Sequence, residues 1–546
     1  MGALFRTWRQ GAIEWRSHEE DERLVRALVG DADPRTDAAR WRTVQENRHR
    51  TVRRVEGHAE HASPGAYLKV VRTRGASRRL RSLFWGDQAW REWASAQEMH
   101  GRRLPVPRPL AYGRGGGSTL YLCETIPGAR TLPELLASLP SASGILSRIG
   151  AFVARLHDAG ASHPDLHISN LLFSGPDGTP HLLDLHSSRI RRRMKPRRRA
   201  RELGVLIGSV GWLTAPDRLR IVLGYARESR YDRPRTRRFA RAAWRAARGA
   251  TAKHLASRTR RTLKRSSGFD RDSRDHWRAI WRAGSHLNLE MLRALVEAHR
   301  EARSSSGAAV RASIRKNAPE TAVTVGHDLA GTRVCVKAYR PRGLLDRLRG
   351  LVRRRRAKRA WVAAHGLAVR GVPVPEPLAV AEHGEEGFLV SREITPGRQL
   401  DTLLAERGAA WLRTPESAAL LESLARLLRK GFRHGVRFGD LKGCNIVVRE
   451  SPGAPPEAIL TDVDGTRFHR FLPRQARLRA FLQLNTSIPR AVPLRTRVAF
   501  LRAVLRGERR ATLRWFARAC AQVSLTRQIV YVGAQGDVHE TARQPA

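Results

Sequence analysis

The feature that most constrains this chain is an internal duplication. Four short landmarks occur twice, in the same order, along 546 residues. The second occurrences follow the first by 268, 268, 275 and 278 residues, a drift of only ten. Loop insertions produce such a drift, whereas chance matches do not keep both order and spacing. The landmarks are AYLKVVR and VCVKAYR around Lys69 and Lys337, LPVPRPLA and VPVPEPLA from Leu104 and Val372, HPDLHISNLLF and FGDLKGCNIVV from His163 and Phe438, and LLDLH and LTDVDG around Asp184 and Asp462.

The duplication predicts two similar domains, which suits a chain long enough for two to four. The boundary is expected near residue 250, after a basic helical tract. Residues 46–248 and 249–525 are the predicted domains. Residues 1–45 are interpreted as an N-terminal extension and 526–546 as a C-terminal tail, because neither has a recognisable counterpart in the other copy. A shorter match, LIGS at 206–209 and LNTS at 484–487, keeps the offset of 278.

The first landmark predicts a strand with a Lys at its centre, because apolar and β-branched residues alternate around it. Only nine of the 102 basic residues are Lys, so Lys69 and Lys337 at matching positions are informative. A Lys held on a strand can reach the α- and β-phosphates of a nucleotide. A solvent-facing Lys would look the same in isolation, but the repeated context favours phosphate binding.

A helix is predicted after the Lys69 strand, and it carries Glu92. This carboxylate is the candidate partner that fixes the direction of Lys69. The Trp that follows Glu92 is repeated, and this alignment places Ala360 opposite Glu92. The second copy is therefore expected to lack the ion pair and to bind phosphate with poorer preorganisation. Glu124 and Glu393 also match across the copies, in strands that run into a Pro-Gly turn, and their role could be structural.

The third and fourth landmarks supply acidic and amide side chains. Asp165 can orient an attacking hydroxyl or accept its proton. Asn170, five residues later, and Asp184, on the next predicted strand, can ligate one metal ion between phosphates, while His163 would support the loop. Oxygen ligands of this kind suit Mg²⁺ or Mn²⁺. The second copy offers Asp440, Asn445 and Asp462, with Phe438 in place of His163.

Other chemistries fit this region poorly. His157, His163, His167, His181 and His186 lie close together in sequence, but their spacing is not that of a usual zinc site and the second copy lacks most of them. No nucleophile elbow or HExxH motif suggests a hydrolase. The four Cys residues are widely spaced and form no CxxC motif, which favours a reducing compartment over a disulfide framework.

The formal charge of +52 favours contact with phosphates, anionic lipid or nucleic acid, and charge alone does not choose between them. No zinc finger or RNA-recognition signature is present, so specific nucleic-acid binding is not expected. The N-terminus lacks the apolar core of a signal peptide, and the longest apolar stretch, 203–215, is too short to span a bilayer. We expect a cytoplasmic protein, and peripheral docking on the inner membrane face stays open.

The order of Lys, helix Glu, Pro-x-Pro, Asp-Leu-x-x-x-Asn and apolar-Asp resembles the protein-kinase-like superfamily. More narrowly, LHDAGASHPDLHISNLLF resembles the bacterial lipopolysaccharide kinases, the Kdo-kinase and heptose-kinase group. Aminoglycoside-type phosphotransferases share the Asp-Leu-His-x-x-Asn pattern. The resemblance covers most of the chain, twice. It implies an α+β fold of two tandem bilobal domains, each with an antiparallel β N-lobe and a mainly helical C-lobe.

The resemblance also implies an ATP- and Mg²⁺-dependent kinase (Mn²⁺ being the alternative metal) that phosphorylates a sugar or anionic glycolipid hydroxyl. In this reading Asp165 and Asp440 are catalytic, Lys69, Glu92 and Lys337 bind the nucleotide, and Asn170, Asp184, Asn445 and Asp462 hold the metal. The basic tracts from Arg189 and Arg347 are candidate contacts for an anionic substrate or membrane, or simply solvated helix faces.

The chain departs from typical protein kinases in several places. Neither copy has a clear GxGxxG loop, although VGHDLAG at Val325 to Gly331 is a loose substitute. Asp-Leu-His and Asp-Val-Asp-Gly stand where Asp-Phe-Gly is usual, and no Ala-Pro-Glu segment follows. These departures favour a small-molecule or glycolipid kinase. An atypical serine/threonine protein kinase and a pseudokinase scaffold, in the second copy above all, are the alternatives.

Overall fold

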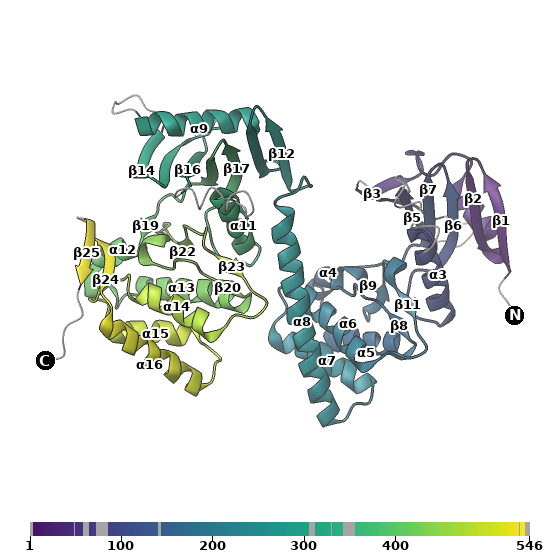
Figure 1. The fold of residues 1–546 in the computed structure, drawn as a ribbon. Helices are drawn as coiled ribbons and strands as arrows, with labels where there is room; N and C mark the ends of the chain where they lie inside the picture. Colours follow the sequence, from purple (N-terminus) through teal and green to yellow (C-terminus); the bar gives the residue numbers. More distant parts are fainter. Residues whose placement is uncertain are drawn as a thin grey trace. The chain divides into compact units, whose positions relative to one another are not determined.

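The structure is a computed structural model that describes residues 4–47, 50–57, 65–72, 86–139, 143–304, 312–328, 330–341, 355–533 and 536–540. The chain divides into two compact units, Met1–Thr251 and Ala252–Ala546 (Figure 1). The division lies a few residues from the predicted boundary at 248, and it falls within helix α8 (Arg233–Arg261).

The first unit begins with a seven-stranded antiparallel sheet. Its strand order is β1-β2-β6-β7-β5-β4-β3. Helix α1 (Glu22–Val29) contributes to the apolar core of this sheet, and helix α3 (Gln88–Gly101) packs on β6 and β7. The strands are β1 (Phe5–Gln10), β2 (Ile13–His18), β3 (Arg42–Glu46), β4 (Arg50–Val55), β5 (Ala66–Arg72), β6 (Pro109–Gly115) and β7 (Ser118–Glu124).

The second unit repeats this sheet strand for strand. Its order is β12-β13-β17-β18-β16-β15-β14, and all pairs are again antiparallel. The helices that accompany it are α9 (Leu289–Ser304) and α11 (Arg356–Ala368). The strands are β12 (Phe269–Arg274), β13 (Trp277–Arg282), β14 (Ala312–Ala318), β15 (Thr321–His327), β16 (Arg333–Tyr339), β17 (Pro377–His383) and β18 (Glu386–Arg392).

The position of β1 and β2 corrects the expectation that residues 1–45 form a separate extension. These strands occupy the same end of the sheet as β12 and β13, and α1 follows them as α9 follows β13. Ile13 and Trp15 are buried in one core with Leu68 of β5 and Leu120 of β7. Burial of these large side chains joins the segment to the first unit, although its sequence has diverged from its counterpart.

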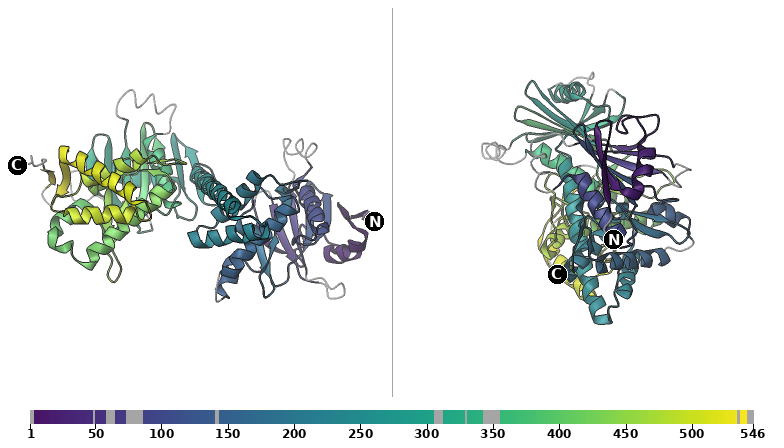
Figure 2. Two further views of the ribbon diagram at one scale, coloured as in Figure 1. Left: turned by 90° about the horizontal axis from the view of Figure 1, so that it is seen from below. Right: turned by 90° about the vertical axis from the view of Figure 1, so that its right-hand side faces the viewer.

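Each unit continues into a mainly helical lobe (Figures 1 and 2). In both units a two-stranded pairing, β8 with β11 or β20 with β23, lies beside the third landmark. The first lobe contains α4 (Leu132–Ala137), α5 (Ser143–Asp158), β8 (Ala161–Ser162), β9 (Leu171–Ser174), β10 (Thr179–Leu182), β11 (Arg189–Ile190), α6 (Pro196–Ser209), α7 (Ala215–Glu228) and α8. The second contains β19 (Arg398–Gln399), α12 (Leu400–Trp411), α13 (Pro415–Arg433), β20 (Val436–Arg437), β21 (Ile446–Arg449), β22 (Glu457–Leu460), β23 (Arg467–Phe468), α14 (Arg474–Asn485), α15 (Leu494–Val504) and α16 (Arg510–Thr526).

The C-terminal residues are also part of a unit, which corrects their prediction as a free tail. Strands β24 (Ile529–Gly533) and β25 (Gly536–Glu540) form a hairpin. The Val532 amide donates to the buried carboxylate of Asp401 at 3.0 Å, and the Val530 amide donates to the Thr486 carbonyl at 3.1 Å. These bonds attach the hairpin to the second helical lobe.

The two helical lobes differ in how tightly their helices pack. In the first, α5 and α7 meet backbone to backbone, since a Cβ on Gly150 would lie 1.9 Å from the Ile221 carbonyl oxygen. In the second, an apolar cavity of about 1200 Å³ lies among α12, α13, α15 and α16.

Every helix within the described ranges is too short or too polar to cross a membrane. Each unit consists of an antiparallel sheet followed by a mainly helical lobe, which confirms the predicted α+β class and the two tandem bilobal domains.

Candidate functional site

Lys69 points away from the core of the first sheet because the side chains of a strand alternate between its two faces. Its neighbours Leu68 and Val70 are buried in that core. On the other face, the Lys69 ammonium forms an ion pair with Glu92 of α3, which is 2% exposed. Burial alone would lower the pKa of Lys69, but Glu92 outweighs it and the pKa is raised. Lys69 is thus a fixed cation, paired as the sequence predicted.

The third landmark forms a short loop that projects Asp165 outward. The side-chain amide of Asn170 donates to the Asp165 carbonyl at 3.0 Å, and the Ile168 amide donates to the Ser209 hydroxyl at 3.1 Å. The Leu183 amide donates to the Asn170 carbonyl at 2.8 Å, which joins the loop to the fourth landmark. The Asp165 side chain itself is 71% exposed, so its carboxylate is available to a substrate.

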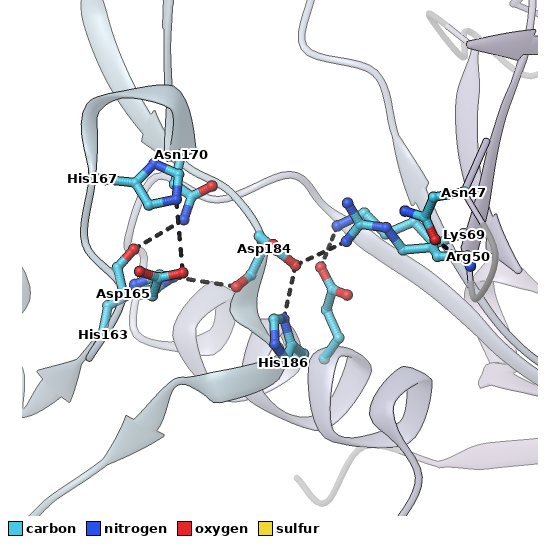
Figure 3. A network of polar contacts seen from close by, with 10 residues as sticks. Asn47, Arg50, Lys69, His163, Asp165, His167, Asn170, Asp184 and His186 are labelled. Carbon is cyan, nitrogen blue, oxygen red and sulfur yellow. Dashed lines mark hydrogen bonds and ion pairs between the residues drawn. The ribbon is translucent and has the colours of Figure 1, made fainter. Parts of the chain in front are cut away.

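Asp184 lies between this loop and Lys69 (Figure 3). It has left-handed backbone angles, φ 57° and ψ 57°, which are uncommon outside glycine and mark functional turns. His163 Nε2 donates to the Asp184 carbonyl at 3.2 Å. The carboxylate accepts from His186 at 2.8 Å and pairs with Arg50 at 3.3 Å. Burial would raise the pKa of Asp184, but His186, Lys69 and Arg50 hold it well below its ordinary value.

The donor set around Asp184 fits a divalent cation. Ligand atoms of Glu92, Asp184 and His186 all lie within 4.8 Å of one another. Asn170 uses its amide nitrogen to support the loop, so its amide oxygen is the group left for ligation. Carboxylate and amide oxygens suit Mg²⁺ or Mn²⁺. His186 adds a candidate ligand that the predicted pair of Asn170 and Asp184 did not include.

A buried polar network holds the loop from below. Glu202 of α6 is 3% exposed and accepts from the Ser162 hydroxyl at 2.7 Å and from the His163 amide at 2.9 Å. His157 contacts the same carboxylate at 3.3 Å. Burial would raise the pKa of Glu202, but these hydrogen bonds lower it. The pKa of His157 is lowered, first by burial, so it is a neutral donor. Glu202 therefore anchors the residues immediately before Asp165.

In the second unit the Lys makes a different pair. Lys337 lies on β16, and its ammonium is 2.6 Å from Asp462, which also has a left-handed backbone, φ 47°. Ala360, fully buried on α11, occupies the position predicted to match Glu92. The predicted loss of the helix carboxylate is therefore accompanied by a direct contact between Lys337 and the candidate metal ligand Asp462. Asp464, the counterpart of His186, pairs with Arg356 at 3.3 Å.

The second loop keeps the architecture of the first. Asn445 donates to the Asp440 carbonyl at 3.0 Å, and the Gly443 amide donates to the Ser487 hydroxyl at 2.8 Å. The repeated Ser of LIGS and LNTS thus has one role in both units. The anchor beneath the loop is apolar, however. Phe438 packs against Phe432 with ring centroids 6.0 Å apart, and Ala480 lies at the position of Glu202.

The sequence reasoning missed Arg50 and Glu202. Arg50 gives no signal among 102 basic residues, and its contact with Asp184 spans 134 positions. Glu202 was detectable, because it is the first acidic residue after the basic tract that begins at Arg189.

Glu124 and Glu393 form ion pairs with Arg108 at 3.2 Å and Arg333 at 2.6 Å, respectively. Two further predictions fall partly outside the described residues, namely the tract from Arg347 and the loop 325–331.

Comparison with known proteins gives a family. The profile of the lipopolysaccharide kinase (Kdo/WaaP) family matches residues 35–225 and again 323–503. The 3-deoxy-D-manno-octulosonic acid kinase of Vibrio parahaemolyticus is 34% identical over 98 residues, which is 16% of this chain and 41% of the relative. That of Vibrio cholerae is 28% identical over 139 residues, 22% of this chain and 59% of the relative. The chain thus spans about half the length of these curated relatives.

Solved structures that match part of the chain include WaaP in complex with acyl carrier protein. It is 20% identical, with a TM-score of 0.29, and the match covers 38% of this chain and 88% of that one. An aminoglycoside-3'-phosphotransferase of type VIII is 13% identical, with a TM-score of 0.28, over 41% of this chain and 98% of that one.

Proposed function

The chain belongs to the lipopolysaccharide kinase (Kdo/WaaP) family, and from this premise we propose that it is an ATP-dependent phosphotransferase. The acceptor is a hydroxyl of a lipopolysaccharide core sugar or a similar envelope glycolipid. The similarity to 3-deoxy-D-manno-octulosonic acid kinases supports this acceptor class. The protein works in the cytoplasm, with its basic surface available to the inner face of the membrane.

The observation that carries the proposal is the convergence of Asp165, Asn170 and Asp184 beside the Lys69–Glu92 pair. Lys69, directed by Glu92, binds the α- and β-phosphates of ATP. Asn170 and Asp184, with His186 nearby, hold Mg²⁺ or Mn²⁺, which neutralises phosphate charge when bound. The ionised Asp184 carboxylate suits this role because its pKa is held low.

Asp165 orients the acceptor hydroxyl and accepts its proton. The hydroxyl oxygen then forms a bond to the γ-phosphorus as the bond to the β–γ bridging oxygen breaks, and ADP leaves. Catalysis of this kind consists mainly of positioning and charge stabilisation. The anchoring of the loop by Glu202 and Ser209 serves the positioning.

The second unit has a different proposed role. Asp440, Asn445 and Asp462 repeat the arrangement, but Lys337 is held by Asp462 itself rather than by a helix carboxylate. We assign nucleotide binding to Lys337, with Asn445 and Asp462 as metal ligands and Asp440 as the weaker catalytic carboxylate. A pseudokinase scaffold is the second candidate for this unit, and the Lys337–Asp462 pair favours it.

The test is transfer of radiolabelled γ-phosphate from ATP in the presence of a crude envelope glycolipid fraction, with total protein as the competing acceptor. We expect label in the glycolipid fraction that depends on Mg²⁺ or Mn²⁺. Label in protein alone would contradict the acceptor class and would indicate an atypical serine/threonine protein kinase. Absence of label from both fractions would contradict phosphotransfer.

A further inference from the structure

A run of exposed cations follows the candidate metal ligand of the first unit. It runs from β11 through the connecting segment to the first turn of α6, within the tract that begins at Arg189. Met194, in the same segment, is only 2% exposed. The exposed members, here called the basic strip, are Arg189, Arg192, Arg193, Lys195 and Arg197.

The basic strip is attached directly to the loop that carries Asp165. β11 pairs with β8, which places Arg189 opposite Ser162, three residues before Asp165. The Arg191 amide donates to the Gly160 carbonyl at 3.0 Å. Gly160 has φ +80°, and a Cβ there would lie 2.1 Å from the Arg191 carbonyl oxygen. Only glycine allows this close approach, so the local backbone is built to keep the strip beside the loop.

The charge of the strip is not neutralised locally. Its five members form no ion pair within the described ranges, in contrast to Arg199, which pairs with Asp158. No acidic residue lies between Asp184 and Glu202, and Glu202 is buried and fully engaged below the loop. Helix α6 also begins within the strip with no acidic residue in its first turn. Its positive end and the guanidinium groups favour the same kind of ligand, an anion.

The second unit provides an internal comparison. The matching pairs Gly160–Arg191 and Gly435–His469, and the loop-capping Ser209 and Ser487, align the two stretches without a gap. In this alignment Arg193, Lys195 and Arg197 are replaced by Phe471, Pro473 and Gln475, whereas Arg189 and Arg192 are kept as Arg467 and Arg470 and Pro196 is replaced by Arg474. Phe471 is 62% exposed. The local geometry is kept with three exposed cations instead of five, so the fold does not require the cations at 193, 195 and 197.

We propose that the basic strip binds a phosphate group that the acceptor already carries, next to the hydroxyl that faces Asp165. This inference rests on the proposed function and narrows it. The first unit takes an acceptor that is already phosphorylated, and the second unit, which lacks three of the five cations, shares this selectivity more weakly. Several guanidinium groups around one site favour a dianionic phosphate over a single carboxylate, since each can donate two parallel hydrogen bonds.

The test uses the full chain and two acceptors. One is deacylated lipopolysaccharide core oligosaccharide with its phosphates, and the other is the same oligosaccharide after chemical dephosphorylation. The strip variant is Arg192→Gln/Arg193→Gln/Lys195→Gln. The matched control, Arg237→Gln/Arg238→Gln/Arg241→Gln, removes the same charge from exposed positions of α8 in the same unit. An Arg192→Lys/Arg193→Lys variant keeps the charge.

We expect the strip variant to raise KM for the phosphorylated acceptor by about tenfold or more, with KM for ATP unchanged. The control and the Lys variant stay within a few-fold of wild type, and the dephosphorylated acceptor does not distinguish the proteins. An equal acceptor KM in strip and control variants overturns the inference. So does loss of binding to phosphatidylglycerol vesicles with an unchanged acceptor KM, which would make the strip a membrane contact.

Failure of the proposed function is distinguishable from failure of this inference. If wild-type protein transfers phosphate to neither acceptor, the proposed function fails. Calorimetric binding of the two oligosaccharides to wild type and to the strip variant then tests the strip without turnover. Tighter binding of the phosphorylated form that the strip variant loses supports the inference, and equal binding overturns it.

Discussion

Lys69 and Glu92 form a buried ion pair in the first unit, whereas Lys337 in the second contacts Asp462 at 2.6 Å. The two Lys residues lie on equivalent strands of equivalent sheets. Their partners differ in kind, because Glu92 comes from a helix and Asp462 from the loop that would hold the metal. In the proposed role of the second unit, nucleotide binding would have to separate Lys337 from Asp462, which is also its proposed metal ligand.

Replacing Glu92 with Gln should lower kcat/KM for ATP by about 10- to 100-fold, because one charge-assisted hydrogen bond to Lys69 is lost. Glu98→Gln is the matched control, since Glu98 lies on the same helix and forms an exposed pair with Arg102. Steady-state kinetics with varied ATP measures both. If Glu92→Gln and Glu98→Gln lower kcat/KM equally, the effect comes from the loss of a negative charge on the helix and not from the contact between Glu92 and Lys69.

Ala360→Glu should improve nucleotide binding by the second unit. The new carboxylate would take the position of Glu92 and free Asp462 from Lys337. We expect Mg-ATP to bind about tenfold more tightly, the value of one charged hydrogen bond. Calorimetry in an Asp184→Asn background, which weakens the first site, isolates the effect. Unchanged affinity in a protein with unchanged thermal stability would contradict this role for residue 360.

Gly160→Ala should unfold or displace the loop from His163 that carries Asp165. The new Cβ would clash with the Arg191 carbonyl oxygen at 2.1 Å, and the positive φ adds strain. Together these cost about 3 kcal/mol. Gly175→Ala is the control, because Gly175 has φ +68° but open space around it, so only about 1 kcal/mol of strain applies. Chemical denaturation compares them, and similar losses would rule out the close approach as the cause.

The stability of the first unit should fall as pH decreases through about 6.5. The pKa values of His157 and His163 are lowered by burial, so below pH 6.5 the unfolded chain binds protons that the folded unit excludes. Each such His costs about 1.4 kcal/mol per pH unit. The substitution His157→Phe removes one of these two titrating groups and introduces the residue that the second unit has at the matching position, Phe432.

Hydrogen exchange of α5 at pH 7.5 and 5.5 measures this effect. Between these values the Glu202 carboxylate stays ionised, because its pKa is lowered. We expect the acid-induced loss of protection to be smaller in His157→Phe than in wild type. Identical losses would mean that His157 titrates no differently in the folded unit.

The fold could be predicted from the sequence because the repeated landmarks are short strands and loops with functional side chains. The membership of residues 1–45 in the first sheet was not predicted, because it depends on the burial of Ile13 and Trp15. Burial tolerates many apolar residues, so that segment kept its architecture while its sequence diverged. The C-terminal hairpin was not predicted for a related reason. It is attached to Asp401 through a backbone amide, which any residue type supplies.

The site could be predicted as far as spacing along the chain determines it. Asp165 and Asn170 lie in one loop, and Lys69 and Glu92 lie on adjacent elements. Arg50 could not be found, because sequence spacing carries no information on a contact between β4 and a distant loop. The exchange of Glu202 for Ala480 can be aligned from the sequence, but its meaning depends on the hydrogen bonds that Glu202 forms beneath the loop.

The most direct test of the central claim is γ-phosphate transfer to envelope glycolipid by Asp165→Asn and Asp440→Asn variants of the full chain. Loss of a positioned carboxylate costs about 10²- to 10⁴-fold. We predict a loss of this size in Asp165→Asn, with Asp440→Asn retaining most of the wild-type rate. If neither substitution changes the rate, or if only Asp440→Asn does, the first unit is not the phosphotransferase described here.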